Sequence, residues 1–162
     1  MQKITCAVIT LSDRSFKKER DDLSGPSIVN ILQKNSNYEI TDTILLPDEY
    51  DDLIKTFIYL CDVKKVNLIL TTGGTGFSKR DITPEATLSV ADRIIPGISE
   101  AIRAYSLKIT PNAMLSRAVA AIRNQTVIIN MPGNPKAITE VLEYILTPLE
   151  HGVDVLLGRA DG

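Results

Sequence analysis

Residues 67–87, which read NLILTTGGTGFSKRDITPEAT, constrain the fold of this chain more than any other stretch. The run 68–71 is apolar and β-branched, which is typical of a strand buried on both faces. Three glycines then interrupt it: Gly73, Gly74 and Gly76. Glycine lets the backbone take left-handed angles and approach a ligand closely, and successive N–H groups in such a turn form a concavity for phosphate. Thr83 and Pro84 suit the N-cap and first position of a following helix.

The glycine loop does not match the better-known phosphate loops. A Walker A loop has the pattern G-x-x-x-x-G-K-[ST], and counting from Gly73 places Ser78 at its second glycine and Arg80 at its hydroxyl position. The dinucleotide-binding fingerprint fails as well, because Lys79 stands at its third glycine and the loop follows the third strand. An ordinary tight turn is the simpler alternative, but three glycines flanked by threonines exceed what a turn requires.

Predicted strands alternate with predicted helices along the chain. The strands lie at residues 4–11, 38–46 and 68–71, and helices begin at Pro26, at Asp48, at Pro84, after Pro96-Gly97, at Pro135 and again at Thr147. Residues 118–122 and 126–130, with turn residues between them, favour a β-hairpin, although 118–123 also suits the end of a helix. The alternation predicts an α/β fold in one domain over residues 1–162: a three-layer open sheet, mostly parallel, with helices on both faces and a short antiparallel hairpin.

Ligands of open α/β sheets bind beyond the carboxyl ends of the strands. Four stretches are therefore expected to converge at one edge of the sheet: residues 12–14, 47–49, 73–81 and 132–135. The polar segment 15–25 is expected to be a loop that moves or closes over something. The candidate binding residues are Ser12, Asp13, Thr72, Gly73, Gly74, Thr75, Gly76, Ser116, Pro132, Gly133, Asn134 and Pro135.

Asp48 and Asp81 are the candidate catalytic and metal-binding residues. Two carboxylates facing a phosphate site are the usual way to hold Mg²⁺, which keeps several waters and bridges to phosphate oxygens. Without the metal, they and a triphosphate would repel strongly in a low-dielectric cleft. Simpler roles stay open: Asp48 can serve only as the N-cap of its helix, and Asp81 can pair with Arg80 or cap the next helix. Their shared position at the predicted edge favours the metal site.

Other polar residues near this edge have two interpretations. Asp13 and Arg14 either belong to the site or form an exposed ion pair. Arg117 either reaches an anion or lies on the surface. Asn134 is expected to cap its helix, and the N–H groups at that cap also suit an anion.

Charge and cysteine content exclude several classes. The formal net charge is −2 and there is no basic run, which argues against a nucleic-acid surface. Cys6 and Cys61 lie in apolar patterns without a C-x-x-C spacing, so they are expected to be buried thiols. Residues 1–11 are too short and too polar for a signal peptide or a membrane span, and a cytoplasmic protein is expected.

The chain resembles the molybdopterin adenylyltransferase family, the MogA/MoaB type that includes the G domain of gephyrin. Four motifs carry the resemblance, in this order: ITLSDR, LPDE, TTGGTGFSKRDITPEAT and INMPGNPKAI. It implies a trimer or hexamer that transfers AMP from Mg-ATP to the phosphate of molybdopterin and releases pyrophosphate, in molybdenum or tungsten cofactor synthesis. The product would pass to a molybdenum insertase.

The resemblance also assigns residues. The family's catalytic aspartates map onto Asp48, in LPDE, and Asp81, in KRD. The glycine loop and the PGNP loop at 132–135 map onto nucleotide and pterin binding. The resemblance leaves open which of the two loops binds the AMP half of the product and which binds the pterin half. Two other functions stay open, a non-catalytic module that binds molybdopterin or a nucleotide and an oligomeric scaffold. The two acidic residues beside a full glycine loop favour an enzymatic function, that of a nucleotidyltransferase. A scaffold would need neither the acidic pair nor the glycine loop.

Overall fold

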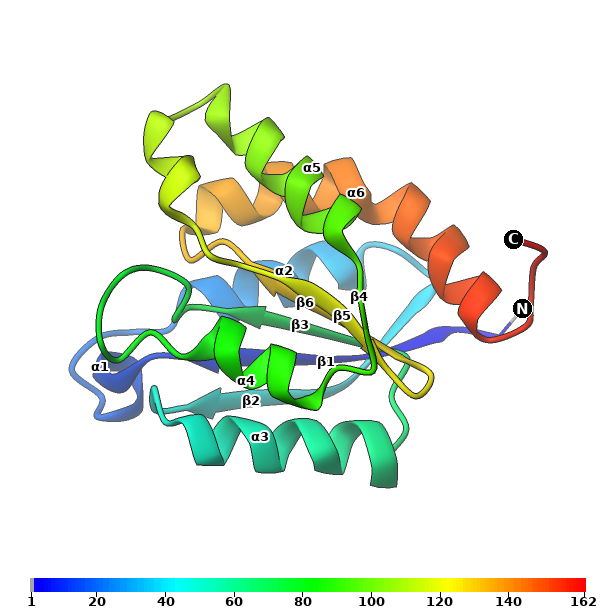
Figure 1. Cartoon of the computed structure of the whole chain (residues 1–162), viewed down its shortest axis with the longest axis horizontal. Coiled ribbons are helices and arrows are strands. Elements are labelled where there is room, and N and C mark those ends of the chain that lie inside the picture. The colour runs from blue at the N-terminus through cyan, green and yellow to red at the C-terminus, as the bar shows by residue number, and fades with distance from the viewer. Residues whose placement is uncertain (1) are drawn as a thin grey trace.

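The computed structural model describes residues 2–162 and contains one six-stranded sheet (Figure 1). Its strands are β1 (Ile4–Leu11), β2 (Tyr38–Leu46), β3 (Leu68–Thr72), β4 (Arg93–Ile94), β5 (Ala120–Arg123) and β6 (Thr126–Met131), in the spatial order β2-β1-β3-β6-β5-β4. Strands β2, β1, β3 and β6 run parallel, and β5 is antiparallel to both β6 and β4. The prediction of a mostly parallel sheet with an antiparallel hairpin is therefore confirmed.

Helices cover both faces of the sheet. They are α1 (Asp13–Phe16), α2 (Ser24–Gln33), α3 (Tyr50–Ile58), α4 (Thr83–Val90), α5 (Pro96–Leu107) and α6 (Pro135–Leu156), with a π-helical turn (Tyr59–Val63) after α3 and a 3-10 helix (Pro111–Leu115) after α5. Helices α2, α5 and α6 pack on one face, and α3 and α4 on the other (Figure 1). The result is the predicted three-layer architecture.

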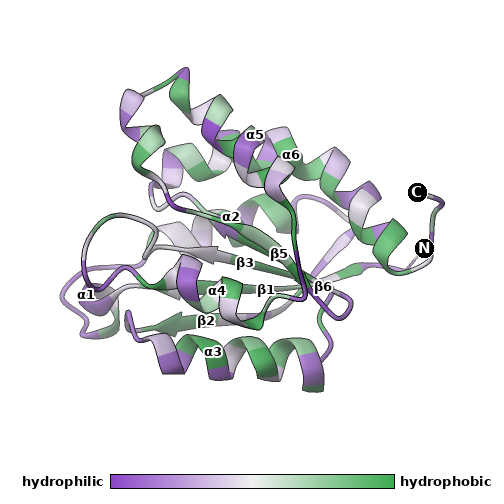
Figure 2. Ribbon diagram, viewed as in Figure 1, coloured by the Kyte–Doolittle hydropathy of each residue, from purple (hydrophilic) through white to green (hydrophobic). Residues whose placement is uncertain are grey.

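Each face of the sheet has its own apolar core, because successive strand residues point to opposite faces. Val8 and Leu70 pack under α2 and α6, whereas Ile9 and Ile69 pack against α3 and α4. Burying one such side chain contributes about 1.5–3 kcal/mol. Figure 2 shows the central strands as largely apolar and the helices as apolar on only part of their surface. The strands therefore occupy the middle layer, and their carboxyl ends open onto one edge.

Several predicted boundaries are wrong. Helix α2 begins at Ser24 rather than Pro26, and the predicted loop 15–25 starts inside the one-turn helix α1. Helix α3 begins at Tyr50 with Glu49 as its N-cap, so Asp48 is not a helix cap. Thr83 is the first residue of α4, not its cap, because its hydroxyl donates to the Gly73 carbonyl instead (2.9 Å).

The C-terminal helix differs most from the prediction. Helix α6 continues through Pro148 instead of restarting at Thr147. Proline removes one backbone hydrogen bond, but Ile145, Leu149 and Val153 stay on one buried face of a continuous helix. Strand β4 was not predicted, because two exposed residues carry no recognisable pattern.

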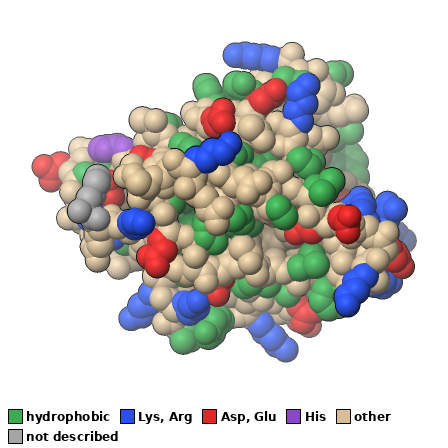
Figure 3. Space-filling model, turned by 180° about the vertical axis from the view of Figure 1, so that it is seen from behind, with side chains coloured by type: hydrophobic (Ala, Val, Ile, Leu, Met, Phe, Trp, Pro, Cys, Tyr) green, Lys and Arg blue, Asp and Glu red, His purple; other side chains and the backbone are tan. Residues whose placement is uncertain are grey.

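The surface carries charges of both signs. The back of the molecule shows basic and acidic side chains interspersed over that face (Figure 3), in keeping with a formal net charge of −2. Within residues 2–162, no helix combines the length and apolarity that crossing a membrane requires.

Candidate active site

The four stretches at the carboxyl ends of β1, β2, β3 and β6 meet at one cavity of about 710 Å³. Among the predicted site residues, those that line it are Ser12, Asp13, Asp48, Thr72, Gly73, Gly74, Asp81, Gly133 and Pro135. The convergence follows from the topology, because parallel strands end at the same edge of the sheet. Both candidate metal-binding aspartates therefore face one space.

Asp13 and Asp48 form a reciprocal pair that joins the ends of β1 and β2. The backbone N–H of Asp13 donates to Oδ2 of Asp48 (2.9 Å), and the N–H of Asp48 donates to Oδ1 of Asp13 (3.0 Å). The other carboxylate oxygen of Asp48, Oδ1, is buried without a hydrogen-bond partner. A buried carboxylate oxygen without a partner is costly, and a cation is one group that would satisfy it.

The electrostatic surroundings of Asp48 are unfavourable for its charge. Burial raises the pKa of the Asp48 carboxyl above its ordinary value, and the negative charges of Asp13 and Asp81 raise it further, whereas the hydrogen bond from Asp13 and the charge of Arg80 lower it. The donor set suits Mg²⁺: two carboxylates on one cavity leave the remaining positions to water and phosphate oxygens. Within residues 2–162 no third His, Cys, Asp or Glu joins them in a metal-binding group.

This arrangement gives a prediction for the protein without ligands. Replacing Asp48 by asparagine keeps an acceptor for the Asp13 N–H and removes the buried charge, so we expect the thermal unfolding midpoint to rise at pH 7. Because the folded-state pKa is raised, the ionised carboxylate weakens the fold at neutral pH, and this cost disappears as the pH falls toward 3.8. The difference in unfolding midpoint between Asp48→Asn and the wild type should therefore disappear as the pH falls.

The matched control for this prediction is Asp51→Asn, which removes an exposed charge from the first turn of α3. Its midpoint should not rise, because an acidic residue stabilises a helix N-terminus. Magnesium chloride should raise the midpoint of the wild type and of Asp51→Asn but not of Asp48→Asn. An equal response of all three proteins to magnesium would contradict the metal site at Asp48.

The glycine loop is fixed from two sides. Gly73 and Gly74 have φ values of 96° and 71°, and a Cβ on Gly73 would overlap the carbonyl oxygen of Leu11 in β1. The carbonyl of Gly74 accepts from the N–H of Thr83 (3.1 Å), which ties the loop to the first turn of α4. Thr72 donates its hydroxyl to the carbonyl of Pro132 (2.7 Å), which ties β3 to the PGNP loop. The glycines therefore meet both a conformational and a steric requirement.

Arg117 holds the rest of the loop and does not reach into the cavity. Its Nε donates to the carbonyl of Gly76 (2.8 Å), one terminal nitrogen donates to the carbonyl of Asp81 (2.9 Å), and the other pairs with Glu85 (2.8 Å). Its backbone N–H also donates to the carbonyl of Thr75 (2.9 Å). Neither predicted role, reaching an anion or lying free on the surface, describes this residue.

We expect Arg117→Ala to speed amide hydrogen exchange in residues 75–81 by about tenfold, because two loop carbonyls lose a charged donor. Arg117→Lys should have nearly the same effect, since one ammonium group cannot reproduce the planar fork of a guanidinium. Arg93→Ala, an exposed change in β4, is the control. If hydrogen exchange in residues 75–81 were unchanged in both Arg117 variants, the loop would not need the Arg117 side chain to keep its conformation.

Other predicted residues lie elsewhere or act differently. Ser116 does not line the cavity, and its hydroxyl accepts from the N–H of Ala118 (3.3 Å). Asn134 caps α6 through the N–H groups of the first turn, as predicted. Thr75, Gly76 and Pro132 contribute backbone contacts next to the cavity rather than to its lining.

Arg80 pairs with residues that the sequence did not suggest. It donates to both oxygens of Asp13 (3.0 and 2.9 Å) and to Glu49 (2.8 Å), rather than pairing with Asp81, and Asp13 pairs with it rather than with Arg14. These bonds hold the pKa of the Asp13 carboxyl below its ordinary value. Asp81 instead accepts from the N–H of Ser78 (3.0 Å).

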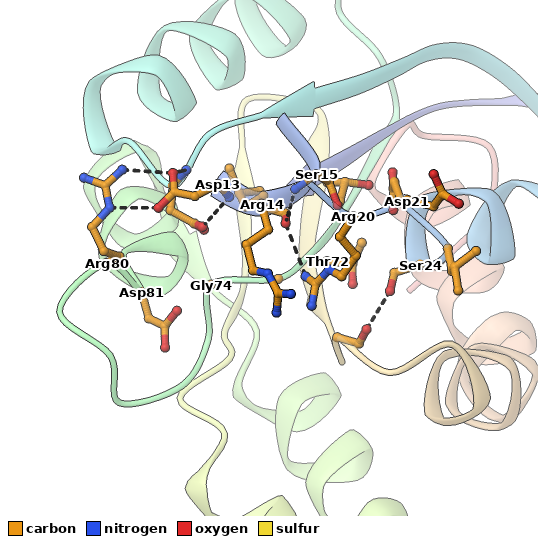
Figure 4. A pocket seen from close by; sticks show the side chains of 18 of the residues that line it. Asp13, Arg14, Ser15, Arg20, Asp21, Ser24, Thr72, Gly74, Arg80 and Asp81 are labelled. Atoms are coloured by element: carbon orange, nitrogen blue, oxygen red, sulfur yellow. Dashed lines mark hydrogen bonds and ion pairs between the residues drawn. The ribbon is translucent and has the colours of Figure 1, made fainter. Parts of the chain in front are cut away.

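The segment after β1 contributes lining residues that sequence reasoning missed. Arg20 lines the cavity and donates to the hydroxyl of Ser12 (3.3 Å), and Ser24 donates to the carbonyl of Gly133 (2.6 Å). Arg14, which the sequence had already suggested as a site residue, also lines the cavity (Figure 4). The signal for Arg20 was the run KKERDD at residues 17–22, two residues after the ITLSDR motif, which places charges near a strand end.

Comparisons with known proteins identify the family. The family model described as "Probable molybdopterin binding domain" matches residues 7–151. Molybdopterin adenylyltransferase of Helicobacter pylori (strain J99) is 43% identical over 98% of this chain and 91% of its own length, and that of Escherichia coli K12 is 41% identical over 90% and 75%. Gephyrin of Dictyostelium discoideum is 42% identical over 92% of this chain and 22% of its own length.

Solved structures agree with these sequence relatives. The molybdopterin biosynthesis enzyme MoaB of Thermus thermophilus superimposes with a TM-score of 0.89 at 39% identity, covering 96% of this chain and 97% of that one. The tungsten cofactor synthesizing protein MoaB of Pyrococcus furiosus has a TM-score of 0.83 at 32% identity, covering 99% of both chains. The chain therefore belongs to the molybdopterin-binding domain family, of the MogA/MoaB type to which the molybdopterin adenylyltransferases belong.

Proposed function

We propose that this chain is a molybdopterin adenylyltransferase that transfers AMP from ATP to the phosphate of molybdopterin, with Mg²⁺ as cofactor and pyrophosphate as second product. The relatives of that name in Helicobacter pylori and Escherichia coli are 43% and 41% identical to it, over 98% and 90% of its length. The observation that carries the proposal is the cavity shared by Asp48 and Asp81 beside the glycine loop, with Oδ1 of Asp48 left without a partner.

Asp48 and Asp81 are the residues that would hold the metal. When bound, Mg²⁺ neutralises charge on phosphate oxygens. The reciprocal bonds between Asp13 and Asp48 fix one carboxylate, and the N–H of Ser78 orients the other. The chain therefore supplies two preoriented acidic ligands from the ends of β2 and the glycine loop, and neither has to reorganise when the substrates arrive.

The remaining residues position the phosphates. The molybdopterin phosphate forms a bond to the α-phosphorus of ATP while the bond to the departing pyrophosphate breaks in line. Such transfers are accelerated mainly by positioning and by stabilising charge. Gly73 and Gly74 line the cavity, and backbone N–H groups of their turn would hold a phosphate. No side chain needs to act as a general base, since the attacking phosphate is already ionised near neutral pH.

The test is to incubate the purified protein with molybdopterin, Mg²⁺ and ATP, and to follow pyrophosphate and adenylylated molybdopterin. Release of pyrophosphate only when both substrates are present supports the proposal. Equilibrium binding of molybdopterin or ATP with no release of pyrophosphate would instead support a binding module. We also propose that the chain acts in the cytoplasm as a homo-oligomer, a trimer or a hexamer, and that its product passes to a molybdenum insertase.

A further inference from the structure

The segment that follows β1 brings two arginines to the cavity, Arg14 and Arg20, together with Asp21 and Asp22. Arg14 comes from the one-turn helix α1, and Arg20 comes from the loop between α1 and α2. In Figure 4 both guanidinium groups are directed into the site, between Gly74 of the glycine loop and Ser24 at the start of α2. Neither residue is needed to hold a metal, and neither belongs to the glycine loop.

The three arginines that line the cavity differ in whether they form ion pairs. Arg80 is occupied by Asp13 and Glu49 through three charged hydrogen bonds. Across residues 2–162, by contrast, no ion pair includes Arg14 or Arg20. The hydrogen bond of the Arg20 side chain goes to a neutral acceptor, the Ser12 hydroxyl. A guanidinium has five N–H donors, so most of those on Arg20 remain available to a ligand.

Ser12 places Arg20 in the cavity. Ser12 caps α1, because its hydroxyl oxygen accepts from the N–H of Ser15 (3.1 Å). The same oxygen accepts from a terminal nitrogen of Arg20 (3.3 Å). Ser12 itself is buried, so this acceptor is fixed in position. Holding a long side chain in advance reduces the entropy that is lost when it binds a ligand. Ser12 is thereby a positioning residue for Arg20.

The charge balance of the cavity shows what these arginines face. Five carboxylates line it, those of Asp13, Asp21, Asp22, Asp48 and Asp81, and three guanidiniums, those of Arg14, Arg20 and Arg80. One divalent cation would balance this excess of two negative charges. Once such a cation is bound, the two arginines without a charged partner attract an anion.

We propose that Arg14 and Arg20 bind a phosphoryl group in this cavity, beside the carboxylates of Asp48 and Asp81. Guanidinium groups bind phosphate through two parallel hydrogen bonds, which favours this ligand over a monatomic anion such as chloride. The phosphoryl group belongs either to the β- and γ-phosphates of the nucleotide or to the phosphate of the second substrate. This inference deepens the proposed function, but its central readout is binding and does not require turnover.

The experiment is calorimetric titration of pyrophosphate, ATP and AMP, each with Mg²⁺, into the full-length wild type, Arg20→Gln and Lys18→Gln. Lys18 is the matched control, because it lies in the same loop, carries the same charge and does not line the cavity. We expect Arg20→Gln to weaken pyrophosphate and ATP about tenfold, the loss of one charge-assisted hydrogen bond, with a smaller effect on AMP. The affinities of Arg20→Lys should lie between those of Arg20→Gln and the wild type, and the affinities of Lys18→Gln should match those of the wild type.

The arms of the experiment identify the source of the phosphate. If Arg20→Gln binds pyrophosphate and ATP normally but needs about tenfold more molybdopterin to reach half its maximal rate, the arginines bind the phosphate of the second substrate. If Arg20→Gln matches Lys18→Gln in all its affinities and in its KM values for ATP and molybdopterin, the inference is wrong. A wild type that binds pyrophosphate through Arg20 yet transfers no AMP would overturn the proposed function and leave this inference standing.

Discussion

Asp81→Asn is expected to lower the rate of AMP transfer by about a hundredfold or more. A metal contributes several kcal/mol of charge stabilisation in a transition state, and each 1.36 kcal/mol corresponds to about tenfold in rate. The asparagine oxygen can still accept from the N–H of Ser78, so the loop should keep its conformation. The measurement is the initial rate of pyrophosphate release at saturating ATP and molybdopterin, with circular dichroism and sedimentation as checks of folding and assembly.

The matched control for this rate measurement is again Asp51→Asn, which changes the charge by the same amount on the exposed first turn of α3. It should keep the wild-type rate. Raising the Mg²⁺ concentration should partly restore Asp81→Asn, because a weakened site fills at higher metal concentration. A near-native rate in Asp81→Asn at low Mg²⁺ would remove Asp81 from the catalytic pair, even if the chain proved to be an adenylyltransferase.

Gly73→Ala should produce the largest loss of stability, about 3 kcal/mol in the free energy of unfolding. The residue has a φ of 96°, which costs an L-residue about 1–3 kcal/mol. The new Cβ would also overlap the carbonyl oxygen of Leu11. This residue ends strand β1 and pairs with Leu46 of β2, so it cannot move without disturbing the sheet. Overpacking of this kind adds about 1–3 kcal/mol. Urea denaturation followed by circular dichroism measures the difference.

Gly152→Ala is the control for this substitution. Gly152 lies inside α6, and nothing is within 4 Å of the position of its added Cβ. Alanine is the better helix former there, so this variant should be more stable than the wild type by about 0.5–1 kcal/mol. If Gly73→Ala unfolded at the same urea concentration as the wild type, the glycine would be dispensable for the turn that shapes the cavity.

The buried strands were the most predictable part of the fold. The predicted spans 4–11 and 38–46 are those of β1 and β2, and the hairpin of β5 and β6 surrounds the predicted turn at Asn124, which has a φ of 52°. These patterns are local, because burial on one or both faces fixes the residue type at each position. The helix through Pro148 was missed because packing along α6 outweighs the local effect of a proline.

The sequence by itself determined the α/β class and the four stretches that end at one edge, because both follow from the order of elements and the parallel direction of the strands. Only the tertiary structure decided how the charges pair: Asp13 with Asp48 and Arg80, Arg117 with the glycine loop, and Arg20 with Ser12. Several of these contacts join residues far apart in the chain, and Asp13 and Arg80 are 67 positions apart. Such pairs depend on the distances that packing sets between loops, and no local pattern of residues encodes those distances.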